Sequence, residues 1–173
     1  MKTVTQLLSV SLFAFCSLFL GSCKKDSIEA SGNQELTAGR CEVRFNYSGA
    51  QSGSFQSVLA STTATSGGGF AQIACSVVSG LSVKAVQIGF PTSIAVGTTT
   101  QVSAGADLAN GFLMTYAIDG SGWVIGGGTA SGFSVTVTKN TGTEMEGTFS
   151  GELGSDSDAT KVTLTGGYFH CKL

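Results

Sequence analysis

Residues 133–173 read FSVTVTKNTGTEMEGTFSGELGSDSDATKVTLTGGYFHCKL, and this stretch decides the fold class. Apolar and polar residues alternate in three segments, 133–139, 144–153 and 161–173, which Gly, Ser, Asp and Thr separate. Alternation with a period of two is typical of a β-strand that buries one face, and the separating residues are those that favour turns. The stretch therefore predicts antiparallel β-structure.

The same pattern extends back to Arg40 through short segments rich in Val, Ile, Phe, Thr and Ser, which glycine-rich turns separate. Ile118-Asp119-Gly120-Ser121 predicts a hairpin, because Asp-Gly readily forms its two-residue turn. Helical periodicity is not convincing beyond a turn near residues 104–110. We expect an all-β domain, an antiparallel two-sheet sandwich or, alternatively, an open β-barrel. Its expected strands are residues 40–48, 54–60, 70–79, 82–90, 99–104, 111–118, 123–127, 133–139, 144–153 and 161–173.

The beginning of the chain has the pattern of an export signal. Lys2 supplies a positive start, residues 7–20 are mainly apolar, and Leu20-Gly21-Ser22-Cys23 places small residues before a cysteine. This combination resembles the lipobox of bacterial lipoproteins. The resemblance implies that residues 1–22 are removed, that the thiol of Cys23 carries diacylglycerol and that the new amino terminus is acylated. The alternatives are an ordinary secretory signal or a retained helix, although the apolar run falls short of the roughly 20 residues that span a bilayer.

Residues 23–39 form a lipidated flexible tether in this interpretation, because they have little apolar content and no periodic pattern. A flexible chain of this length has a root-mean-square reach of about 20 Å. Its start, Lys24-Lys25-Asp26, resembles lipoproteins of the Bacteroidota. That resemblance implies an O-glycosylation pattern at Asp26-Ser27-Ile28, with Ser27 as the candidate acceptor. The β-domain then occupies residues 40–173.

The C-terminal part of the chain carries a second resemblance, in Gly147-Thr148-Phe149 and in Gly167-Tyr168-Phe169. It is similar to small Bacteroidota envelope lipoproteins whose C-terminal β-sandwich domain, of unknown function, has a Gly-Thr-Phe strand followed by a Gly-x-Phe strand. The likeness is clearest over the last 40 residues. It implies a β-sandwich lipoprotein of the cell envelope, anchored at the outer membrane, and it transfers no catalytic residue. Which face of that membrane the domain occupies stays open.

Three cysteines remain after Cys23: Cys41, Cys75 and Cys171. Exported proteins can form disulfides, and an odd number leaves at least one thiol free or bonded to another molecule. We favour Cys41–Cys171, because both lie on the apolar sides of the first and last strands, which often neighbour one another in a sandwich. The bond would close a loop of about 130 residues and contribute roughly 4–5 kcal/mol in the chain-entropy model. Three buried free thiols are the alternative, and Cys75 is expected in the core.

The composition favours neither nucleic-acid binding nor enzyme chemistry. Removal of Lys2 with the leader leaves eight basic and eleven acidic residues, a formal net charge of −3 with His170 neutral, and no basic cluster lies beyond Lys24-Lys25. His170 is the only histidine, and it points away from Phe169 and Cys171 in the predicted strand. The chain has no Gly-x-Ser-x-Gly elbow and no zinc-ligand spacing. We expect no enzyme activity, cofactor or metal.

Two acidic segments are the remaining candidates for site chemistry. Glu144 and Glu146 share one strand face, which is more typical of a solvated surface than of a glycosidase pair. Residues 152–158 offer oxygen ligands for calcium but lack the spacing of a helix-loop-helix calcium loop, so we expect a solvated hairpin.

Aromatic residues supply the sharper binding hypothesis. Trp123 and Tyr116 flank the turn at Asp119-Gly120, where their rings could stack against a sugar or a peptide. Core packing of these rings is the alternative. We therefore expect a membrane-anchored structural or protein-interaction module, with a glycan-binding module that uses Trp123 and Tyr116 as the alternative and a hydrolase as the weakest one.

Overall fold

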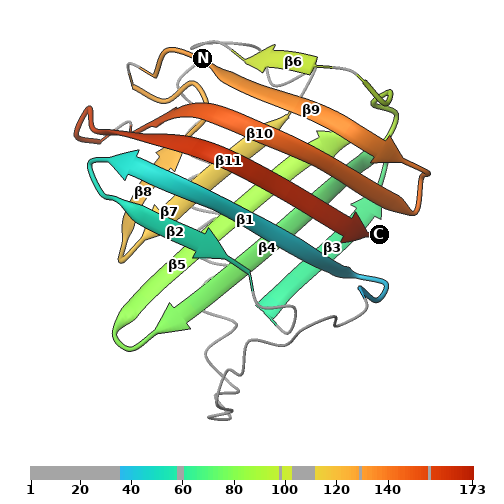
Figure 1. Cartoon of the computed structure of the whole chain (residues 1–173), viewed down its shortest axis with the longest axis horizontal. Coiled ribbons are helices and arrows are strands. Elements are labelled where there is room, and N and C mark those ends of the chain that lie inside the picture. Colours follow the sequence, from blue (N-terminus) through green and yellow to red (C-terminus); the bar gives the residue numbers. More distant parts are fainter. Residues whose placement is uncertain (1–35, 58–60, 98, 103–111, 129, 156) are drawn as a thin grey trace. The chain divides into compact units, whose positions relative to one another are not determined.

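The computed structural model describes residues 36–173, apart from 58–60, 98, 103–111, 129 and 156 (Figure 1). Cys23, Ser27 and the turn expected near residues 104–110 lie outside the described residues. The described part is built from β-strands and contains no helix. The strands are β1 (Arg40–Gly49), β2 (Gly53–Gln56), β3 (Thr62–Gly67), β4 (Phe70–Ser79), β5 (Ser82–Pro91), β6 (Thr99–Val102), β7 (Leu113–Ile118), β8 (Ser121–Val124), β9 (Phe133–Asn140), β10 (Glu144–Gly154) and β11 (Lys161–Lys172).

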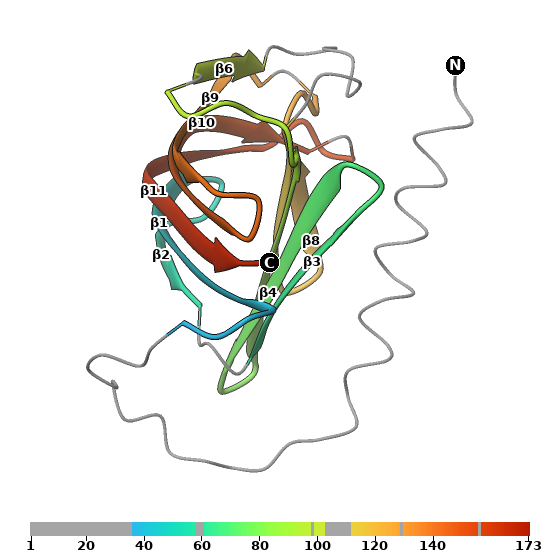
Figure 2. The ribbon, with the colours of Figure 1, turned by 90° about the vertical axis from the view of Figure 1, so that its right-hand side faces the viewer.

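All the strands belong to one antiparallel sheet that curls into a half-barrel. Its main path runs β2-β1-β11-β10-β8-β7-β5-β4-β3, while β9 pairs with β10 and β6 pairs with β9. The prediction of an all-β antiparallel fold is confirmed. The two arms of the curled sheet face each other across the core as the layers of a sandwich do, and the curl itself matches the open-barrel description (Figures 1 and 2).

The two arms differ in charge. We call β1, β9, β10 and β11 the charged half, because these strands carry nine Lys, Arg and Glu residues together with His170. We call β3, β4, β5, β7 and β8 the neutral half, because Lys84 is the one charged residue within their bounds. In Figure 1 the strands of the charged half cross in front of those of the neutral half.

The two halves meet along both margins of the curl. At one margin Gly154 of β10 pairs with Val124 of β8. At the other margin the backbone N–H of Ala64 donates to the carbonyl of Gly39 at 2.9 Å. The backbone N–H of Cys41 also donates to Oγ1 of Thr62, at 3.0 Å. These bonds satisfy backbone groups that an open sheet edge would leave to solvent.

The core is a chain of aromatic rings contributed by both halves. Phe45 and Phe149 of the charged half lie 5.8 Å apart between ring centroids, and Phe45 lies 5.0 Å from Tyr116 of the neutral half. Phe90 of the neutral half stacks on Phe169 of the charged half at 5.6 Å. Burial of these rings removes large apolar areas from water and holds the two halves together.

A glycine bulge interrupts the regular pairing of β11. Arg44 of β1 pairs with Tyr168, but Asn46, two residues on, pairs with Thr165, so β11 holds one additional residue in this interval. Gly166 takes a positive φ of 61°, which few residues other than glycine adopt. A side chain at Gly167 would collide with the ring of Phe149. The sequence Gly166-Gly167 therefore suits the bulge.

Most of the expected strands coincide with observed ones, and residues 70–79 match β4 at both ends. The hairpin at Asp119-Gly120 is confirmed, because Ile118 pairs with Ser121 and both turn residues have positive φ. The expected strand at 123–127 begins earlier in the structure, as β8. Strand β3, TTATSG, was not predicted, because it buries only Thr62 and Ala64 and so lacks the large apolar residues of a strand pattern.

Candidate functional site

The outward side chains of the charged half form what we call the polar ladder. The alternation of each strand points these side chains away from the core, and the register brings residues from neighbouring strands together. His170 of β11, for example, pairs with Glu42 on β1 and with Glu146 on β10. The ladder consists of Glu42, Arg44, Lys139, Glu144, Glu146, Tyr168 and His170.

Glu144 is the centre of one end of the ladder. One of its carboxylate oxygens lies 2.6 Å from Nε2 of His170, and the other lies 2.8 Å from Nζ of Lys139. The hydrogen bond from Lys139, followed by the one from His170, lowers the pKa of Glu144 to about 2. Both oxygens are thus engaged, and the group stays ionised near neutral pH.

Tyr168 is the centre of the other end. Its hydroxyl donates to Oε1 of Glu146 at 3.1 Å. Burial, followed by this hydrogen bond, raises the pKa of Tyr168 to about 12. The guanidinium carbon of Arg44 lies 4.3 Å from the centre of the Tyr168 ring, and Arg44 also forms an ion pair with Glu42. The cation–π contact contributes about 0.5–1 kcal/mol at an exposed site.

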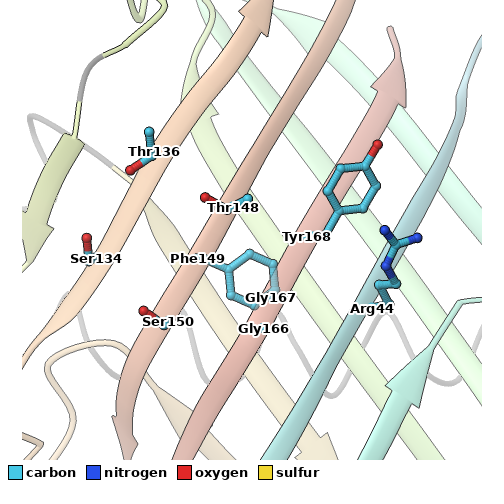
Figure 3. A pocket seen from close by; sticks show the side chains of 9 residues that line it. All are labelled: Arg44, Ser134, Thr136, Thr148, Phe149, Ser150, Gly166, Gly167 and Tyr168. Atoms are coloured by element: carbon cyan, nitrogen blue, oxygen red, sulfur yellow. The ribbon is translucent and has the colours of Figure 1, made fainter.

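A shallow groove of about 440 Å³ opens beside Tyr168 on the same face. The bulge at Gly166-Gly167 lies in the groove and puts no side chain into it (Figure 3). Hydroxyl groups donate and accept hydrogen bonds, so the groove suits a polar ligand. We call it the hydroxyl groove, and its polar side chains are Ser134 and Thr136 of β9, Thr148 and Ser150 of β10, Tyr168 of β11 and Arg44 of β1.

The two aromatic residues proposed for ligand binding lie in the core. Trp123 is 3% exposed and Tyr116 is 1% exposed, so neither offers a ring face to a ligand. They pair across the β7–β8 hairpin, as expected, but both point inward, and Nε1 of Trp123 donates to Oγ1 of Thr160 at 3.0 Å. This burial corrects the hypothesis of a ligand site at Trp123 and Tyr116, because the curl of the sheet turns their face of the hairpin toward the core.

The cysteines occupy inward positions. Cys41 and Cys171 are directly opposed on β1 and β11, with Cα atoms 4.2 Å apart, and they form a disulfide in the structure. Cys75 on β4 is a buried free thiol, as expected for a core residue, and burial raises its pKa to about 12.

The remaining candidates from the sequence have structural partners. Glu144 and Glu146 share the outward face with His170, as the alternation predicts. Glu152 accepts hydrogen bonds from Ser131 and lies 3.2 Å from Nζ of Lys161. Among the described residues no group of three or more His, Cys, Asp or Glu side chains is arranged to hold a metal ion.

Sequence reasoning did not find the hydroxyl groove. The alternation that predicts β1 and β11 also places Arg44 and Tyr168 outward, which is a usable signal. The pairing of Cys41 with Cys171 also sets the register in which Arg44 opposes Tyr168, because the bulge lies beyond this pair. The other polar side chains of the groove lie on β9 and β10, whose register with β11 no local spacing gives.

No helix that is long and apolar enough to cross a membrane occurs in the described part of the chain. Comparison of the sequence with family models and with curated proteins, and of the structure with solved structures, finds no match.

Proposed function

We propose that this chain is a membrane-anchored lipoprotein of the cell envelope, held at the outer membrane by lipid on Cys23, with one non-enzymatic protein-interaction domain. The observation that carries the proposal is the outward face of the charged half, where the polar ladder borders the open hydroxyl groove. Interfaces of this composition obtain specificity from directional hydrogen bonds and from complementary charge.

The contacts of the ladder favour binding over turnover. A general base works best when its pKa lies near the working pH, and a pKa of about 2 makes Glu144 a weak base at neutral pH. The hydroxyl of Tyr168 is bound to Glu146, and its raised pKa keeps it protonated. A hydrolase is therefore the least supported of the candidate functions.

Site-specific photo-crosslinking in cells tests the proposal. A photoreactive residue replaces Ser150, which lies in the hydroxyl groove, and a matched chain carries it at Thr63, an exposed position of β3 in the neutral half. We expect one discrete protein adduct from position 150 that Tyr168→Ala removes. Equal adducts from both positions, or none from position 150, would contradict an interaction through the groove.

A glycan-binding module is the second candidate, and the composition of the groove favours it. Four Ser and Thr side chains line the groove together with Tyr168, a combination that matches the hydroxyls and the apolar faces of a sugar. Thermal unfolding of the purified protein with envelope glycans and dietary polysaccharides tests this function. A ligand at 100 times its Kd adds about 2.7 kcal/mol, or several degrees. Tyr168→Ala should abolish the shift, and Thr65→Ala on β3 should keep it.

A further inference from the structure

The hairpin between β4 and β5 ends in an apolar tip formed by Val78, Leu81 and Val83. Leu81 is fully exposed, Val78 is 59% exposed and Val83 is 44% exposed. Val78 and Val83 are cross-strand partners, so their side chains lie on the same face, in the second residue pair behind the turn. Contiguous exposed aliphatic groups are a feature of surfaces that contact a protein or a membrane.

The turn itself does not require a leucine. Ser79 pairs with Ser82, so Gly80 and Leu81 are the two central residues, and Gly80 has a positive φ of 63°. Such a turn needs glycine at the first central position and accepts polar residues at the second. The other two-residue hairpin turns in the described part of the chain are Gly68-Gly69 and Asp119-Gly120, which carry no large aliphatic side chain.

Few charged groups lie near the tip. The sequence from Phe45 to Val83 contains no Lys, Arg, Asp or Glu. The ammonium of Lys84 turns away, donating to the carbonyl of Ser54 at 3.1 Å and lying 5.3 Å from the centre of the Tyr47 ring. Asp119 lies beside the hairpin, where its carboxylate accepts hydrogen bonds from Oγ of Ser82 at 3.1 Å and from the backbone N–H of Val83 at 2.7 Å.

We propose that the apolar tip dips into the surface of the bilayer that holds the lipid anchor, as a second membrane contact of the domain. This inference rests on the anchor of the proposed function. Twelve residues, 24–35, separate Cys23 from the described part of the chain, and a flexible chain of that length has a root-mean-square span of about 20 Å, which keeps the tip within reach of the lipid. Tethering of this kind gives an effective concentration in the millimolar range, so a few aliphatic side chains suffice for contact.

The contact defines an orientation for the domain. Asp119 accepts hydrogen bonds from Ser82 and Val83, so its carboxylate sets a limit to insertion at the first residue pair behind the turn. The tip belongs to the neutral half, while the hydroxyl groove opens on the outward face of the charged half, across the core. With the tip in lipid, the groove is therefore presented to water and to partners.

Fluorescence of the full lipidated chain in vesicles tests the contact. Leu81→Cys is labelled with an environment-sensitive dye. The matched control is Ser66→Cys, an exposed position of β3 that pairs with Ala71 at the opposite end of β4. Cys75 is buried and Cys41 is bonded to Cys171, so the introduced thiol is the reactive one among the described residues. The vesicles contain phosphatidylethanolamine and phosphatidylglycerol, and bound protein is isolated by flotation before measurement.

We expect a blue-shifted emission at position 81 with protection from aqueous iodide, and no change at position 66. Val78→Asp combined with Leu81→Cys should lower that protection by about tenfold, the scale of burying one aliphatic side chain. Protein that floats but leaves position 81 as accessible as position 66 overturns the tip contact alone. Protein that fails to float overturns the anchor and the tip together, and protection that appears only after addition of envelope proteins assigns the tip to a protein partner instead.

Discussion

The charged and neutral halves share one sheet and one core, yet they are held in different ways. The charged half contains the Cys41–Cys171 disulfide, the ion pairs of the polar ladder and the bulge at Gly166. The neutral half contains the free thiol of Cys75 and relies on apolar pairing and tight turns. Core packing decides the inward residues in both halves. The two halves therefore differ in their outward residues, which form a hydrogen-bonding surface on the charged half and an apolar tip on the neutral half.

Loss of the disulfide should have the largest effect, and the bond itself lies within the charged half. The double variant Cys41→Ala/Cys171→Ala should lose about 4–5 kcal/mol of unfolding free energy, because the bond closes a loop of 130 residues in the unfolded chain. Urea unfolding with and without reductant measures the loss. Cys75→Ala, the matched change in the neutral half, should cost about 1 kcal/mol. Identical unfolding midpoints with and without reductant would instead support three free thiols.

A pair of glycine substitutions compares the two halves at closer range. Gly167→Ala should cost about 1–3 kcal/mol, because its methyl group collides with the Phe149 ring. Gly122→Ala on β8 meets open space and should be neutral or stabilise by up to about 1 kcal/mol, since alanine restricts the unfolded chain. Thermal or urea unfolding of both variants checks the difference. A Gly167→Ala variant that is as stable as the unchanged protein would show that the bulge accommodates a side chain.

Acid should weaken the charged half first. The pKa of Glu144 is lowered to about 2 from an ordinary value of 4.5, and that of Glu152 is lowered to about 2 as well. A carboxyl group with a lowered pKa adds stability above its ordinary pKa, and this stability disappears as the pH falls from about 4.5 towards 2. Urea midpoints over this window should decline, and Glu144→Gln should flatten the decline. A carboxyl resonance of Glu144 that titrates near pH 4.5 would refute the assignment.

The smallest effect is expected at the apolar tip. Leu81→Ser should change the unfolding free energy by less than about 0.5 kcal/mol, because the side chain is fully exposed and packs on nothing that folding buries. Differential scanning calorimetry of the two proteins measures this. A larger loss would mean that Leu81 has a role in folding and would remove the reason to treat the tip as a contact surface.

The sequence predicted the strands because their inward residues alternate, as Cys41, Val43, Phe45 and Tyr47 do. The sequence did not predict β3, because this strand consists of small and polar residues and the neighbouring strands supply the large apolar side chains of the core. It also left the face of Trp123 open, since Val124 and Ile125 beside it are apolar on both sides of the strand. The curl of the sheet decides that face, and the hydroxyl groove depends on register across four strands, which no local pattern encodes.

The pairing of β1 with β11 joins the first and last strands of the domain, which lie 130 residues apart at the disulfide. Pairings so distant in sequence form late, because the intervening chain must lose much of its freedom before the contact is made. During synthesis, β1 stays without this partner until β11 has been made. We therefore expect the domain to complete its sheet only after β11 has emerged, so that a chain cut short before Lys161 leaves Cys41 unpaired and one edge of β1 exposed to other chains.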